Sequence, residues 1–130
     1  MNKFMVNLTA INPKEEHRST PPVEVMVDTG SLLSWLPKKE LFDIGIMPER
    51  KKRFEMADKQ IIERDIGYAI LTAEGYSTAD EVVFAEDNDM SQQTAPLLGV
   101  RTLEGFGVMV DNIGHRFVAT ATLVCNLSII

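Results

Sequence analysis

The chain has 130 residues, a formal net charge of −6 and a pI near 4.9; 45% of its residues are hydrophobic and 25% are charged. This length and balance predict one soluble globular domain, residues 1–130, whose core needs no disulfide or metal. The acidic surplus argues against nucleic acid and against an anionic membrane surface as partners, because both require a basic surface.

Cysteine content and hydropathy favour the cytoplasm. Cys125 is the only cysteine, so no intrachain disulfide forms; export into an oxidising compartment is not required, although it is not excluded either. The first residues lack the long apolar centre of a signal peptide and lead directly into an alternating segment. No apolar stretch approaches the ~18 residues of a membrane span. We therefore expect a cytoplasmic protein without a membrane partner.

The first third of the chain predicts two strands and a helix. Apolar and polar residues alternate over residues 3–11 and again over residues 23–27, which is the pattern of strands with one buried face. The polar segment between them is bracketed by prolines and predicts a loop. Further on, Pro37 and Gly45 bracket a short helix, with the proline expected at the first helical position.

A hairpin and a further strand are expected next. Strand-like residues flank a polar tip at residues 57–60, and the second strand continues to a turn at Glu74-Gly75. Residues 80–85 predict another strand. The acidic run at residues 86–89 lacks the spacing and the glycine of an EF-hand calcium loop, so we expect a solvated turn there.

The last third predicts a short helix and two strands. The helix starts near Thr102 and ends at Gly105 or Gly107, and the strands cover residues 108–111 and 116–124. Many short strands with two short helices indicate an all-β fold, mainly antiparallel, either a sandwich or a barrel.

Two segments of the chain are loosely alike. Residues 41–46 and 103–108 share the pattern Leu-x-x-apolar-Gly-apolar, and apolar residues with a glycine turn precede each of them. The similarity suggests that one unit of strand, turn, short helix and strand is used twice.

The residues resemble the aspartic proteases of the retroviral type (retropepsins) and their cellular and bacterial relatives. Asp28-Thr29-Gly30-Ser31 ends a strand and matches the active-site motif, with the serine of the pepsin-like version. Leu97-Leu98-Gly99 matches the second family signature, which packs behind the catalytic loop. Residues 54–67 lie where the family has its flap hairpin. The resemblance covers roughly residues 3–124 and implies an acid-protease-like closed barrel with one or two short helices.

The resemblance also implies the roles of the motif residues. Asp28 is the catalytic carboxylate of an aspartic endopeptidase, Thr29 hydrogen-bonds across a dimer axis, and Gly30 lets two such loops approach. Ser31 is expected to donate a hydrogen bond to the Asp28 carboxylate, which favours its ionised form and an acidic activity optimum. Ser31 and the flap residues Ala57 and Asp58 are the candidate substrate-binding residues; Asp58 either selects basic side chains or faces solvent.

Because the chain has one Asp-Thr-Gly, it supplies half of a site. The second unit has no aspartate at the matching place, so we expect a two-fold homodimer in which Asp28 of each subunit meets at the axis. Phe117, Ala119, Ala121, Leu123 and the apolar residues 127–130 either form the dimer interface or complete the monomer core. The substrate is a peptide or protein in extended form.

Other chemistries find little support. The chain lacks a Gly-x-Ser-x-Gly elbow, a His-Glu-x-x-His helix and a phosphate-binding glycine loop, and it has only two histidines. We therefore expect no metal site and no cofactor. Two alternatives stay open. The first is a peptide-binding or scaffolding module of the same fold that does not cleave, and the absence of glycine from the flap tip favours it. The second is an unrelated β-domain in which Asp28 only caps a turn.

Overall fold

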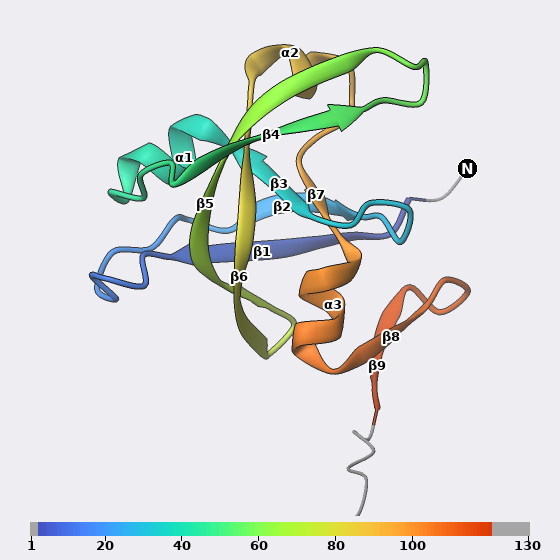
Figure 1. Ribbon diagram of the computed structural model, residues 1–130. Coiled ribbons are helices and arrows are strands. Elements are labelled where there is room, and N and C mark those ends of the chain that lie inside the picture. The colour runs from blue at the N-terminus through green and yellow to red at the C-terminus, as the bar shows by residue number, and fades with distance from the viewer. Residues whose placement is uncertain (1–2, 121–130) are drawn as a thin grey trace, which may run out of the picture.

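The computed structural model describes residues 3–120. These residues fold around a seven-stranded sheet, with three short helices and a separate two-stranded hairpin (Figure 1). The expectation of an all-β fold is confirmed. Within the described range, no helix is long and apolar enough to cross a membrane.

The large sheet has the strand order β1-β2-β7-β3-β6-β5-β4, and most of its pairs are antiparallel. Its strands are β1 (Met5–Ile11), β2 (Val23–Val27), β3 (Ser34–Pro37), β4 (Arg50–Glu55), β5 (Ile61–Ala73), β6 (Tyr76–Ala85) and β7 (Leu97–Leu98). β1 also pairs with β5, so the pairings lead from β1 around to β5 and back to β1. β4 pairs only with β5 and is the edge strand.

The short strand β7 lies between β2 and β3, although it comes about 60 residues later in the chain. It is parallel to β2, with Leu98 opposite Val27, and antiparallel to β3, with Leu97 opposite Trp35. The loop that connects β2 to β3 therefore crosses the end of β7. The last residues of β2 therefore have β1 on one side and β7 on the other.

Alternation along the strands builds the core. In β1, for example, the buried side chains are those at every second position, Val6, Leu8 and Ala10. The larger apolar cluster contains residues from several strands of the large sheet, among them Leu8, Leu71 and Val82. A second cluster packs under the β4–β5 hairpin and consists of Leu33, Trp35, Ile66, Val83, Ala85, Ala95 and Leu97.

The three helices are α1 (Lys38–Asp43), α2 (Asp87–Ser91) and α3 (Val100–Phe106). Pro37 is the residue before α1, with φ −55° and ψ 131°, and not its first helical residue as expected. The prediction of a solvated turn at residues 86–89 is wrong. There, Glu86 and Asp89 form a capping box that starts α2, and Asp89 is buried. α3 begins two residues before the predicted start and ends at Gly107, which has a φ of 74°.

The predicted hairpins are present. β4 and β5 flank residues 56–60, and Glu55 pairs with Ile61. The turn at Glu74 and Gly75 joins β5 to β6, and β6 is longer than expected, because it starts at Tyr76. Of the repeated unit, the structure shows a short strand followed by a short helix in both places: β3 leads into α1, and β7 is followed by Gly99 and then by α3.

The chain end forms a hairpin of β8 (Val108–Asp111) and β9 (Arg116–Ala119). Phe117 is half-buried and its ring packs near those of Phe4 and Phe106, at centroid distances of 5.5 and 6.2 Å. Phe117 therefore belongs to the core of this chain, whereas Ala119 is exposed. The other proposed interface residues, Ala121, Leu123 and 127–130, lie outside the described residues.

Candidate active site

The loop between β2 and β3, residues 28–33 and here called the site loop, is held by backbone hydrogen bonds from two later elements. The Asp28 amide donates to the Leu98 carbonyl in β7 at 2.9 Å. The first two amides of α3 donate to carbonyls of the loop, Val100 to Ser31 at 2.8 Å and Arg101 to Leu32 at 3.0 Å. These bonds satisfy amides that a helix start leaves unpaired, so the loop and α3 fix each other.

The Asp28 side chain is positioned by a tight turn. The Gly30 amide donates to Asp28 Oδ1 at 2.9 Å, and the Ser31 amide donates to the Asp28 carbonyl at 3.2 Å. Asp28 is half-buried, whereas Thr29 and Gly30 are exposed. The turn therefore presents a carboxylate with one free side and leaves the next two residues accessible to another molecule.

Ser31 does not act as expected. Its hydroxyl donates to the Leu33 carbonyl at 2.8 Å, within the same loop. The hydroxyl thus stabilises the loop backbone and not the Asp28 carboxylate. The expected acidic optimum loses the contact on which it was based.

Gly99 allows the site loop and β7 to touch. A Cβ at this position would lie 2.4 Å from the Leu33 carbonyl oxygen, so the backbone there would have to shift. The Gly99 amide donates to Ser34 Oγ at 2.9 Å. Ser34 Oγ is also 2.7 Å from Thr102 Oγ1, and that hydroxyl donates to Asp80 Oδ2 at 2.9 Å. A chain of polar groups thus connects the start of β3, directly after the site loop, with α3 and β6.

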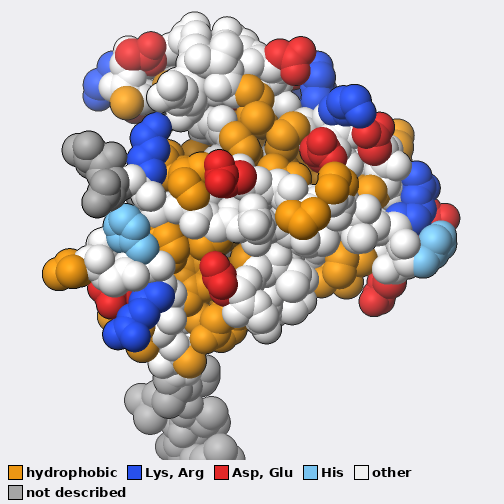
Figure 2. Space-filling model, turned by 180° about the vertical axis from the view of Figure 1, so that it is seen from behind, with side chains coloured by type: hydrophobic (Ala, Val, Ile, Leu, Met, Phe, Trp, Pro, Cys, Tyr) orange, Lys and Arg blue, Asp and Glu red, His pale blue; other side chains and the backbone are white. Residues whose placement is uncertain are grey.

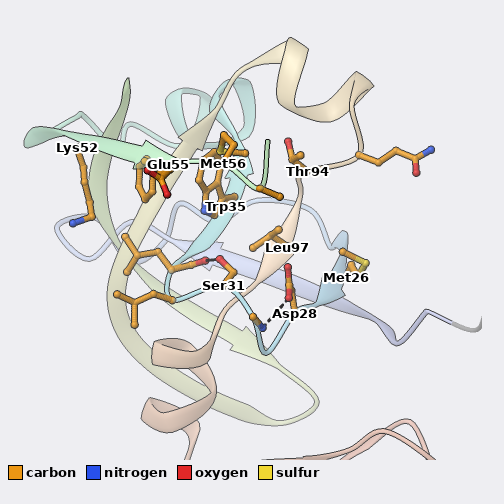
Figure 3. A pocket seen from close by; sticks show the side chains of 15 residues that line it. Met26, Asp28, Ser31, Trp35, Lys52, Glu55, Met56, Thr94 and Leu97 are labelled. Carbon is orange, nitrogen blue, oxygen red and sulfur yellow. Dashed lines mark hydrogen bonds between the residues drawn. The ribbon is translucent and has the colours of Figure 1, made fainter. Parts of the chain in front are cut away.

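A cavity of about 480 Å³ opens beside Asp28, between the site loop and the β4–β5 hairpin (Figure 3). The site loop and β7 form its floor. The hairpin, here called the roof hairpin (β4, its turn and the first half of β5), lies on the opposite side. The residues around the cavity are mostly apolar: Met26, Asp28, Gly30, Ser31, Leu32, Leu33, Trp35, Lys52, Phe54, Glu55, Met56, Ala57, Gln93, Thr94 and Leu97.

The structure brings together four of the six predicted site residues. Asp28, Gly30, Ser31 and Ala57 line the cavity, whereas Thr29 and Asp58 are not among its lining residues. Trp35 is only 5% exposed and also lines the cavity, where its ring packs on the Phe54 ring at a centroid distance of 4.9 Å.

The hairpin tip is a compact turn in which Asp58 has a local role. Asp58 Oδ1 accepts a hydrogen bond from the Gln60 amide at 3.0 Å, and Lys59 adopts a φ of 72°. Asp58 is exposed. Of the two roles left open for it, the solvent-facing one agrees with this geometry.

Sequence reasoning missed a buried ion pair behind the cavity. Arg64 in β5 donates to both carboxylate oxygens of Asp89, each at 2.7 Å, and the two side chains are 13% and 3% exposed. The hydrogen bond to Asp89 raises the pKa of Arg64. The Asp89 carbonyl accepts bonds from the amide and hydroxyl of Thr94, a cavity residue. The roof hairpin is thus attached to the cavity wall through α2.

A second charged group connects the base of the roof hairpin to α3. Glu81 in β6 accepts hydrogen bonds from Arg50 in β4 and from Arg101 in α3, the latter at 2.8 Å. Burial alone raises the pKa of Glu81, but the hydrogen bonds from the two guanidinium groups outweigh it and hold the pKa below its ordinary value of 4.5.

The part of the chain that the structure describes contains no group of three or more His, Cys, Asp or Glu side chains arranged to hold a metal ion. His17 is exposed in the loop after β1. His115 is also exposed and stacks on Phe4 at a centroid distance of 5.5 Å.

No protein-family model matches the chain, and a search of curated proteins gives no match either. The resemblance to retropepsins therefore stays a prediction from the residues and their spacing. What the structure adds is the geometry around Asp28.

Proposed function

We propose that this protein is an aspartic endopeptidase that hydrolyses peptide bonds with a water molecule activated by two Asp28 side chains, one from each subunit of a homodimer. The observation that carries the proposal is the position of Asp28: a turn and β7 hold its carboxylate on the floor of a cavity that the roof hairpin covers. The proposal includes an acid-protease-like closed barrel, in line with the circuit of strand pairings, and a cytoplasmic location.

The chemistry needs two carboxylates that share one proton. The ionised carboxylate takes a proton from the water as it attacks the scissile carbonyl, and the protonated one donates a hydrogen bond to the carbonyl oxygen. Two carboxylates close enough to share a proton do not both ionise readily, so the pair loses its protons in two separate steps.

One chain supplies one of these carboxylates. Among the described residues that line the cavity, the other acidic side chain is Glu55, and Figure 3 shows it on the roof, apart from Asp28 on the floor. A second copy is the simplest source of a partner for Asp28, since a two-fold axis brings equivalent residues together. The exposure of Thr29 and Gly30 supports contact between two site loops.

Exposed apolar side chains also support a partner. On the β8–β9 hairpin, the paired residues Met109 and Val118 are 66% and 43% exposed, and Ile113 at the turn is 98% exposed. Seen from behind, apolar side chains gather in the middle of the molecule while Lys and Arg side chains lie around the margin (Figure 2). Apolar patches of this kind are common at subunit interfaces.

The test compares wild type with Asp28→Asn and Asp58→Asn, using a mixed peptide library and sedimentation over a wide concentration range. We expect cleavage by wild type, unchanged cleavage by the exposed control Asp58→Asn, and a loss of about 10³-fold or more in Asp28→Asn. Activity should fall on dilution as the dimer dissociates. Wild-type activity that survives in Asp28→Asn, or that is the same in monomer and dimer, contradicts the proposal.

A module that binds peptides without cleaving them is the second candidate. The observation that favours it is the attachment of the roof hairpin, whose tip lacks glycine and whose strand β5 is fixed by the Arg64–Asp89 pair. A fixed roof still forms a peptide groove, but it limits closure over a substrate. Saturable peptide binding by wild type together with no turnover under any condition identifies this candidate.

A further inference from the structure

The cavity contains one cation among its described lining residues, Lys52 on the inner side of β4. Lys52, Phe54 and Met56 are half-buried, whereas Lys51, Arg53 and Glu55 between them are exposed. This alternation places Lys52, Phe54 and Met56 on the cavity side of the strand, and Glu55, although exposed, also lines the cavity. Figure 3 shows the Lys52 side chain extending from the roof hairpin beside the floor.

The ammonium group of Lys52 lies near one aromatic ring. Its Nζ lies 5.9 Å from the centroid of the Phe54 ring, within the range of a cation–π contact. The Phe54 ring packs in turn on Trp35, which is buried. This contact favours a position of the ammonium group beside the cavity, which lowers the entropic cost of binding an anion there.

Within residues 3–120, Lys52 has no carboxylate at salt-bridge distance, unlike the two basic residues before it. Arg50 pairs with Glu81, and Lys51 pairs with Asp65 at 3.1 Å. Charged side chains on an edge strand also prevent pairing with other sheets, and the outward-facing Lys51 and Arg53 serve that purpose. Because Lys52 faces the cavity, edge protection does not account for its position.

We propose that Lys52 is a specificity-determining residue, which makes this site select peptides with an Asp or Glu side chain next to the large apolar side chain that fills the cavity. The inference rests on the proposed function, since it assigns the substrate of the same site. The apolar walls, among them Leu33, Phe54 and Leu97, accept the apolar side chain, and the Lys52 ammonium pairs with the carboxylate. In a two-fold dimer, each subunit contributes one such cation.

The expected size of the preference follows from the surroundings of Lys52. A fully exposed ion pair changes affinity only a few-fold, and pairs that are partly removed from water gain more. For the half-buried Lys52 we expect a preference of about tenfold for a Glu peptide over the matching Gln peptide. The preference should decrease at high salt, because the cavity is open to solvent.

The experiment uses peptide pairs that are identical except for Glu or Gln at one position beside an apolar residue. Binding is measured by fluorescence anisotropy with full-length Asp28→Asn, which holds the substrate without turnover, and cleavage is measured with wild type. Lys52→Met keeps the apolar stem and removes the charge; Lys52→Glu reverses it. Lys51→Met is the matched control, because that neighbouring cation faces outward.

We expect the Glu/Gln ratio to fall from about ten to about one in Lys52→Met, to fall below about one in Lys52→Glu, and to stay unchanged in Lys51→Met. The inference is overturned if the Glu/Gln ratio is near one when Lys52 is intact, or if both Lys52 variants leave the ratio unchanged. In that case wild type still cleaves peptides. Failure of the proposed function looks different: no peptide is cleaved, whereas the binding ratio still reports on Lys52.

Discussion

The floor and the roof of the cavity are built in different ways. The site loop is fixed by backbone hydrogen bonds to β7 and α3 and by the close contact at Gly99. The roof hairpin is an edge element, and side-chain pairs attach it: Arg64 to Asp89 at the wall and Arg50 to Glu81 at the base. The comparison teaches that the geometry of the Asp28 turn depends on main-chain hydrogen bonds, whereas the position of the roof depends on side-chain contacts, both ion pairs and the packing of Phe54 on Trp35.

The largest effect is expected on the floor, from Gly99→Ala. The added Cβ meets backbone atoms of Leu33 at 2.4 and 2.6 Å, so β7 and the site loop must separate. We expect the free energy of unfolding to fall by at least about 3 kcal/mol, measured by urea denaturation, together with a loss of cleavage.

Gly30→Ala is the control for this prediction, because a Cβ there meets only the Asp28 side chain, at 3.2 Å. Its stability should change by less than about 1 kcal/mol. If Gly99→Ala is as stable as wild type, the floor is not the close-packed region described above.

A smaller effect is expected on the roof, from Arg64→Met. The substitution leaves the buried Asp89 carboxylate without its bidentate partner, although the Glu86 amide still donates to it at 2.8 Å. We expect a loss of about 2 kcal/mol in unfolding free energy and faster hydrogen exchange in β4 and β5.

Lys51→Met, which removes an exposed pair with Asp65, is the matched control and should cost less than about 0.5 kcal/mol. Restoration of stability in the double variant Arg64→Met/Asp89→Leu would show that the cost comes from the unpaired carboxylate. An unchanged exchange rate in the hairpin would contradict the attachment of the roof through this pair.

The smallest effect concerns Glu81, which links the roof hairpin to α3, the helix that fixes the site loop. Its pKa is lower in the folded protein than its ordinary value of 4.5, so its stabilising effect is complete above that value and is lost as the pH falls through the lower folded pKa. Glu81→Gln should therefore reduce the acid sensitivity of unfolding below about pH 5, by about 1 kcal/mol or less. The exposed Glu74→Gln is the control. Parallel pH profiles for Glu81→Gln and wild type would contradict the prediction.

Much of the fold could be predicted from the sequence, because local patterns determine it. Alternation predicts β1 and β2, and the turn residues predict the hairpins at residues 57–60 and 74–75. The position of β7 could not be predicted in this way. Two leucines carry no periodic pattern, and their insertion between β2 and β3 depends on contacts distant in sequence.

The candidate site was predicted in part. The Asp28 turn and the hairpin tip follow from residue types that favour tight turns. The burial of Asp89 could not be predicted, because a run of acidic residues is usually solvated. Its burial is favourable only because Arg64, distant in sequence, pairs with it. The Ser31 hydroxyl donates to the Leu33 carbonyl, because this local backbone acceptor competes with the Asp28 carboxylate.

The insertion of β7 between β2 and β3 has a consequence for synthesis of the chain. The segment that carries Asp28 leaves the ribosome early, but the strand and helix that fix it lie at residues 97–106. Until those residues have emerged, the loop lacks its hydrogen-bond partners, and pairing across such a distance is slow. A nascent chain therefore carries the Asp28 motif without its geometry, and the site forms only after residues 97–106 have been synthesised.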